Sequence, residues 1–232
     1  MIKSFSFLAR RPGLSHEDFV RHWHSVHVPM SASVPGLRGY VVSTVIERQT
    51  RGDVASFAMA PFDGVAQVWF DDLEARARAG ASMEGRRWHA DGATIIGSIR
   101  MFMTSELSVV PLPARRPVLK TLSVLKRKPE LSRDKFLRHW RDIHAPMARS
   151  VPKLRGFALS ELIEEQFRPD IPAFPMDGPL DGFAESWWDS REARAEMVAS
   201  DQGRAWFADG ATFIGAVQSI LLSEWVVIPP PD

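Results

Sequence analysis

The chain repeats itself, and this internal repeat limits the folds open to it more than any other feature. Arg10 to Tyr40 matches Arg127 to Phe157 without a gap at 17 of 31 positions. A second stretch, Gly85 to Gly97, matches Gly203 to Gly215 at an offset one residue larger. The 232-residue chain is therefore a tandem duplication, and each copy is long enough to form its own core.

Prolines mark the junction between the copies. Val109 to Val118, with the sequence VVPLPARRPV, contains three prolines that cannot continue a helix or a central strand. We therefore predict one domain at residues 1–112 and a second at residues 118–232. Because the connection is short, we expect the copies to pack together; two independent domains on a string are the alternative.

Both copies show the same order of predicted elements. Alternating apolar residues predict strands, and Ser15 and Ser132 are placed to cap the first helix of each copy. A short helix follows the third strand, so the order is βαββαβ, as in a ferredoxin-like domain. One face of such a sheet stays uncovered. We therefore predict an α+β protein of two tandem ferredoxin-like domains, packed sheet to sheet as an intramolecular dimeric α+β barrel. The predicted strands are 2–8, 39–47, 66–70, 99–110, 119–125, 156–164, 184–188 and 217–228.

Composition excludes several classes of protein. The net charge of +1 at pH 7 gives no basic surface for nucleic acid or an anionic membrane. The absence of cysteine excludes disulfides and thiolate chemistry, and it suits a reducing compartment. The sequence has no apolar run of membrane-spanning length and no signal-peptide pattern at its start. We expect a cytoplasmic protein with neither nucleic acid nor membrane as a partner.

One string in each copy resembles a known family. KRKPELSRDKFLRHWRDIHAPMARSVPKLRGF, at Lys126 to Phe157, closely resembles the signature of the EthD family of dimeric α+β-barrel proteins. RRPGLSHEDFVRHWHSVHVPM, at Arg10 to Met30, resembles it too. The resemblance implies a ferredoxin-like barrel and a role in the oxidative breakdown of ethers and aromatics. Related barrels include muconolactone-type isomerases, cofactor-free oxygenases, and polyketide dehydratases or decarboxylases.

Two histidines recur in the signature helix of each copy. At about 100° per residue in an α-helix, His22 and His27 lie about 140° apart, on opposite borders of the apolar stripe. Two metal ligands on one helix are normally three or four residues apart, so this spacing of five predicts no metal site. The sequence also lacks a glycine-rich phosphate loop, and we predict no cofactor.

His27 and His144 are the histidines that match the family motif. An imidazole sheltered between helix and sheet suits a general acid or base. The alternative is that each histidine caps a loose backbone carbonyl where its helix ends. We place His22 and His139 at the domain rim or at the interface between the halves, with catalysis as the alternative role.

The copies differ on the third strand, where Glu185 replaces Gln67. Strand alternation puts Glu185 and Trp187 on one face. If that face lines a pocket, Glu185 and His144 form an acid–base set beside an indole. If it faces outward, Glu185 is a solvated residue.

Eight tryptophans predict broad apolar walls for a small hydrophobic or aromatic ligand. The predicted substrate-binding residues are Trp140, Trp187, Trp23, Trp69, Trp206, Trp88, His89 and Met147.

We predict a cofactor-independent lyase or isomerase that acts on an aromatic or lactone-like small molecule in a catabolic pathway. In this prediction His144 or His27 moves a proton and Glu185 assists. The alternatives are a binding or carrier protein that serves an oxygenase, and a cofactor-free oxygenase. Pairing of two such pseudo-dimers into a homodimer is a further expectation.

Overall fold

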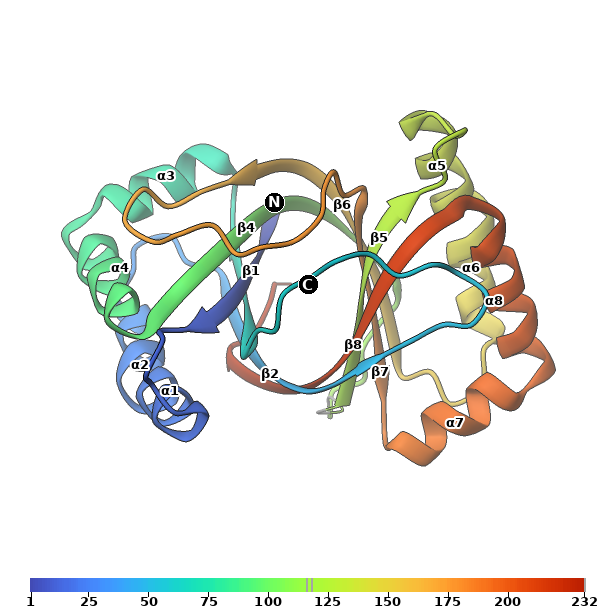
Figure 1. Cartoon of the computed structure of the whole chain (residues 1–232), viewed down its shortest axis with the longest axis horizontal. Coiled ribbons are helices and arrows are strands. Elements are labelled where there is room, and N and C mark those ends of the chain that lie inside the picture. Colours follow the sequence, from blue (N-terminus) through green and yellow to red (C-terminus); the bar gives the residue numbers. More distant parts are fainter. Residues whose placement is uncertain (116, 118, 232) are drawn as a thin grey trace.

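The described residues form eight strands, and these close into one barrel. A computed structural model describes residues 1–115, 117 and 119–231 of the chain. The order around the barrel is β1-β3-β2-β8-β5-β7-β6-β4, and Figure 1 shows the barrel between two groups of helices. The strands are β1 (Ile2–Arg10), β2 (Gly39–Gln49), β3 (Gly64–Phe70), β4 (Ile96–Val110), β5 (Leu119–Arg127), β6 (Gly156–Gln166), β7 (Gly182–Trp188) and β8 (Ile214–Ile228).

Two seams join the copies. Strand β2 pairs antiparallel with β8, and β4 pairs antiparallel with β6. Within each copy the strand order is that of a ferredoxin-like domain. The intramolecular α+β barrel predicted from the repeat is therefore confirmed. The alternative of two domains on a string is wrong, because strands of one copy are hydrogen-bonded to strands of the other.

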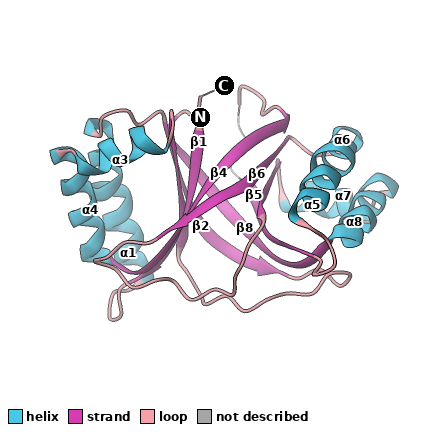
Figure 2. Cartoon of the chain, turned by 90° about the horizontal axis from the view of Figure 1, so that it is seen from above, coloured by secondary structure: helices cyan, strands magenta, loops and turns pink. Residues whose placement is uncertain are grey.

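Helices cover the outer face of the barrel on two opposite sides (Figure 2). In the first copy these are α1 (His16–His22), the π-helical turn η1 (Trp23–His27), α2 (Val28–Met30), the 3-10 turn η2 (Ser31–Ser33), α3 (Leu73–Ala81) and α4 (Met83–Ile95). In the second copy they are α5 (Arg133–His139), the π-helical turn η3 (Trp140–His144), α6 (Ala145–Met147), the 3-10 turn η4 (Ala148–Ser150), α7 (Arg191–Ala199) and α8 (Asp201–Phe213).

Helices α4 and α8 are not predicted by the sequence pattern, because glycines interrupt their apolar periodicity. Ser82 starts α4, since its Oγ accepts a hydrogen bond from the backbone N–H of Gly85. A Cβ at Gly85 would lie 2.0 Å from the carbonyl oxygen of Ala79. Glycine at this position lets α4 begin in close contact with the end of α3.

Strand alternation divides the apolar side chains between separate cores. On β1, Phe5 and Phe7 belong to a cluster inside the barrel, whereas Ile2 and Leu8 pack beneath the helices of the first copy. The loops after β2 and β6 cross to the opposite copy, where Ala55 forms a bridge with Ala216 and Ala173 forms one with Ile99. Each copy therefore places part of its chain against the last strand of the other.

Strand β4 ends at Val110, where the predicted strand 99–110 ends and directly before the first proline of the junction. Arg116 and Val118, which belong to the predicted junction, lie outside the described residues. In the described part of the chain, no helix is both long enough and apolar enough to cross a membrane.

Candidate active site

A π-helical turn changes which histidines are neighbours. In η1 the backbone N–H of Val28 donates to the carbonyl oxygen of Trp23, five residues earlier. A turn closed in this way brings residues five apart onto one side of the helix. The turn precedes Pro29, which has no N–H and would crowd a carbonyl in a regular α-helix. The expected placement of His22 and His27 on opposite borders is therefore wrong.

His22 and His27, the two recurring histidines of the first copy, both bind one carboxylate on α4. The Nδ1 atom of His27 lies 2.8 Å from Oδ2 of Asp91, and the Nε2 atom of His22 lies 3.0 Å from Oδ1. His27 is buried, and its ring nitrogen contacts a side chain and not a backbone carbonyl. The capping alternative is therefore wrong. The two histidines and Asp91 of α4 form a His–Asp–His cluster.

The second copy repeats the cluster around Asp209 of α8. His144 Nδ1 lies 2.7 Å from Oδ2 of Asp209, and His139 Nε2 lies 3.0 Å from Oδ1. Because Nδ1–H of His144 donates to the carboxylate, Nε2 carries the lone pair of the neutral ring. Among the described residues, this Nε2 has no hydrogen-bond partner.

His144 lines a cavity between the second group of helices and the outer face of the barrel. The cavity has a volume of about 60 Å³, less than the roughly 150 Å³ of an enclosed site that holds benzene, and it is partly open to solvent. A ligand with a small ring would therefore extend through the open side. Aromatic, hydroxyl and guanidinium groups contribute to its lining. They include Trp140, Trp206, Phe207, Thr121, Ser123, Ser186, Ser219, Arg51 and Arg194.

Burial controls the charge of His144. Desolvation lowers the pKa of His144 to about 4, although the hydrogen bond to Asp209 acts in the opposite direction. The nearby positive charge of Arg51 lowers this pKa further. At neutral pH the imidazole is therefore uncharged, and its Nε2 can accept a proton.

The two copies differ in the space next to this histidine. At the position of Ser219 the first copy has Met101, and at the position of Ser186 it has Val68. Met101 is buried in the first helical core. The second copy therefore offers more hydroxyl groups beside its histidine and is the stronger candidate for a ligand site.

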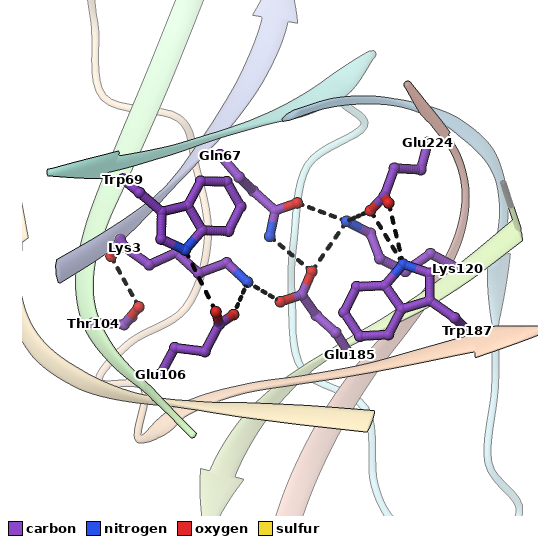
Figure 3. A network of polar contacts seen from close by, with 9 residues as sticks. All are labelled: Lys3, Gln67, Trp69, Thr104, Glu106, Lys120, Glu185, Trp187 and Glu224. Atoms are coloured by element: carbon purple, nitrogen blue, oxygen red, sulfur yellow. Dashed lines mark hydrogen bonds and ion pairs between the residues drawn. The ribbon is translucent and has the colours of Figure 1, made fainter. Parts of the chain in front are cut away.

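Glu185 lies on the other side of the sheet from His144. Its neighbours Ala184 and Ser186 line the cavity, whereas Glu185 points into the barrel, fully buried, and forms ion pairs with Lys3 and Lys120. Figure 3 shows this network. The predicted acid–base set of Glu185 and His144 is therefore not formed, and the alternative of a solvated Glu185 is also wrong.

The barrel network is pseudo-symmetric around one amide and one carboxylate. Gln67 Nε2 donates to Glu185 at 2.7 Å and Gln67 Oε1 accepts from Lys120 at 2.6 Å. Burial raises the pKa of the Glu185 carboxyl, but Lys3 and Lys120 outweigh it and hold this pKa well below its usual range. Glu185 is thus an anion held by two ammonium groups.

Two of the predicted substrate-binding tryptophans belong to this network. Trp69 Nε1 donates to Glu106 at 3.4 Å, and Trp187 Nε1 donates to Glu224 at 3.2 Å (Figure 3). Both indoles line a second cavity of about 800 Å³ at the barrel mouth. They are therefore separated by the sheet from the cavity beside His144.

The other predicted binding residues divide between cavity and core. Trp140 and Trp206 line the cavity, and Trp206 stacks on His144 with ring centroids 5.4 Å apart. Trp23 is buried in the first helical core, and Met147 packs against the second.

Trp88 and His89 occupy the equivalent region of the first copy. Trp88 stacks on His27 with centroids 5.3 Å apart, and its Nε1 donates to the carbonyl oxygen of His27 at 3.1 Å. His89 stacks on Trp88, and its own carbonyl oxygen accepts from Arg168 of the second copy at 2.9 Å. Both residues therefore shape the histidine cluster of the first copy.

The pattern of the sequence does not identify Asp91 and Asp209. Both belong to an ADGAT string that occurs unchanged in the two copies, and this repetition is the signal that marks them. The dipeptide Asp-Gly is typical of turns, so the sequence does not predict that these residues lie in a helix. A Cβ at Gly210 would lie 3.4 Å from Cε1 of His144, so α8 passes directly beside the imidazole that Asp209 binds.

Comparisons with known proteins agree with this architecture. The chain is 32% identical over 107 residues to a 4-carboxymethyl-4-methylbutenolide mutase of Pseudomonas reinekei, a match that covers 46% of this chain and 99% of the mutase. A solved structure of an anthrone oxidase-like protein is similar with a TM-score of 0.63, at 11% identity, over 99% of this chain and 94% of that one. That second likeness concerns the fold alone. The model of the EthD domain matches residues 11–98 and 128–216, and the chain therefore belongs to the EthD family, with one such domain in each copy.

Proposed function

We propose that the cavity of the second copy is the active site of a cofactor-independent isomerase or lyase for a compact lactone-like or aromatic compound. One observation carries the proposal: an uncharged His144, fixed through Nδ1 by Asp209, lines the cavity with Nε2 free of partners among the described residues. Such an imidazole is unprotonated at neutral pH and has a nitrogen that can accept a proton, as a general base must.

The proposed reaction starts at a carbon made acidic by a conjugated carbonyl group. Nε2 of His144 takes the proton, and the electron pair of the broken C–H bond moves onto the carbonyl oxygen. Asp209 stabilises the imidazolium that results. Return of the proton to a different carbon gives an isomer. In the elimination, the enolate pair forms a C=C bond as the neighbouring C–O bond breaks, so the ring oxygen leaves with the electrons of that bond and the ring opens. Neither route transfers electrons to an external acceptor.

The low pKa of His144 affects both directions of the proposed proton transfer. The neutral ring is a weaker base than an ordinary histidine and needs a strongly acidified C–H group, whereas the imidazolium that forms returns its proton readily. Return of the proton by the group that removed it suits an isomerase. The mutase similarity supports the same reaction class and a lactone ring in the substrate.

Hydrogen–deuterium exchange tests the first step of the proposed reaction, which is removal of the proton by His144. A panel of unsaturated five-membered lactones and small phenols in D₂O is followed by proton NMR with and without the protein. The protein should accelerate exchange at a carbon next to the conjugated carbonyl in at least one compound. His144→Gln should slow that exchange at least 100-fold, in line with the usual contribution of a general base of about 10²–10⁴-fold.

His27→Gln is the matched control, because it alters the equivalent cluster of the first copy. It should leave the exchange rate within about two-fold of the parent. Retention of the parent rate by His144→Gln would contradict the assignment. Saturable binding with no exchange would indicate a carrier protein, and uptake of oxygen would indicate a cofactor-free oxygenase.

A further inference from the structure

Arg194 of α7 brings a positive charge without a close carboxylate partner to the wall of the cavity. Its Nε donates to Oγ1 of Thr121 at 3.2 Å, and the side chain is half-buried. Within the described part of the chain, no carboxylate oxygen lies within 4.0 Å of its guanidinium nitrogens, and Nη1 and Nη2 make no hydrogen bond. Burial lowers the pKa of Arg194, and the more distant Glu47 offsets only part of this effect.

Arg76, the equivalent arginine of the first copy, has partners within the protein for both terminal nitrogens of its guanidinium group. Nη1 of Arg76 donates to Oε1 of Gln166, and Nη2 contacts the sulfur of Met101 at 3.5 Å. The second copy changes one of these partners and keeps the residue type of the other. Ser219 takes the place of Met101, and Gln49 takes the place of Gln166.

Gln49 does not bind Arg194 in the way that Gln166 binds Arg76. Its Nε2 donates to Glu47 at 3.2 Å, and its Oε1 is buried with no hydrogen-bond partner. The guanidinium of Arg194 therefore keeps two nitrogens without hydrogen bonds, and its side chain lines the cavity together with Ser219, which replaces the methionine of the first copy.

The second arginine in the cavity wall, Arg51, differs in this respect. It reaches the cavity from the first copy, where Nε donates to Asp53 at 3.0 Å, and Nη2 donates to the carbonyl oxygen of Phe207 at 2.9 Å. Its charge is already paired, so Arg194 is the better candidate to bind an anion.

A guanidinium with two free nitrogens matches a carboxylate, which accepts two parallel hydrogen bonds in a fork. We propose that Arg194 binds a carboxylate group on the compound that enters the cavity beside His144. The substrate class is then a small unsaturated ring that carries an acid side chain. This inference rests on the proposed function for its reaction but not for its binding step.

Binding measurements test Arg194 separately from catalysis. The probes are a butenolide that carries a carboxymethyl group and the neutral primary amide of the same compound, each titrated calorimetrically. All proteins carry His144→Gln, so that turnover does not interfere. The parent should bind the acid more tightly than the amide. Arg194→Gln should weaken binding of the acid roughly 10- to 100-fold, in line with the value of a hydrogen bond to a charged group, and leave the amide within about two-fold.

Arg76→Gln is the matched control, since it removes the equivalent arginine of the first copy and should change neither affinity. Arg194→Lys provides a second variant that keeps the charge but loses the fork, and it should recover part of the affinity for the acid. Equal affinity of the parent for acid and amide, or an unchanged affinity for the acid in Arg194→Gln, would overturn the proposal. Acid binding that depends on Arg194, without proton exchange at His144, would leave this inference intact and refute the proposed reaction.

Discussion

At His144, burial and a carboxylate act in opposite directions on one imidazole. Burial has the larger effect, so it lowers the pKa of His144 in the folded protein to about 4, below the ordinary value of 6.5. The unfolded chain therefore binds more protons than the folded chain between these two pH values. Folding stability from this group is present above pH 6.5 and is lost as the pH falls toward 4.

This linkage predicts a pH-dependent difference between the parent protein and His144→Gln. The free energy of unfolding of the parent should fall by about 3 kcal/mol more than that of the variant between pH 6.5 and 4, since each pKa unit corresponds to about 1.4 kcal/mol. Urea denaturation at several pH values measures both proteins. A difference that stays constant across this range would contradict the assignment of a buried neutral imidazole.

At the scale of elements, the sequence predicts strands well because alternation is a local property. The first strand is expected at 2–8 and is found at Ile2–Arg10. The helix that carries Asp209 is not predicted, because Gly203 and Gly210 resemble turn residues in a sequence read without spatial neighbours. A Cβ at Gly203 would lie 2.0 Å from the carbonyl oxygen of Met197, which is a contact that only the folded chain defines.

The histidine cluster could not be predicted for a similar reason. The spacing of His139 and His144 predicts separation if the helix is regular, whereas the π-helical turn η3 directs both toward Asp209. The proline after the turn is visible in the sequence, but a proline is compatible with a kink as well as with a π turn. The family motif therefore identified the histidines, and only the structure identified the carboxylate that joins them.

At the scale of the whole molecule, the barrel joins the copies through charges as well as through strands. Glu185 of the second copy binds Lys3 of the first and Lys120 of its own copy. Alternation predicts that Glu185 shares a face with Trp187, but it does not say that this face lies inside a closed barrel. The first copy has Gln67 at the equivalent position, so Glu185 bridges the two lysines, and each lysine pairs with a second carboxylate as well, Lys3 with Glu106 and Lys120 with Glu224.

Removal of the Glu185 carboxylate should destabilise the barrel. Glu185→Leu leaves Lys3 with Glu106 and Lys120 with Glu224, but it takes the acceptor from the buried Nε2 of Gln67, and an unsatisfied buried donor costs about 1–3 kcal/mol. Glu196→Leu removes an exposed ion pair with Lys153 and should change the free energy of unfolding by less than about 1 kcal/mol. Urea denaturation at pH 7 measures both variants, and equal stability of the two would show that the network does not hold the barrel together.

The proposed chemistry depends most directly on His144 being an uncharged base whose free nitrogen is Nε2. An NMR titration of ¹⁵N-labelled histidine side chains, assigned with His144→Gln, measures both the pKa and the tautomer of this residue. We expect a pKa of about 4 and, at pH 7, a proton on Nδ1 with none on Nε2. A pKa at or above 6.5, or a proton on Nε2 at pH 7, would contradict the assignment of His144 as the base.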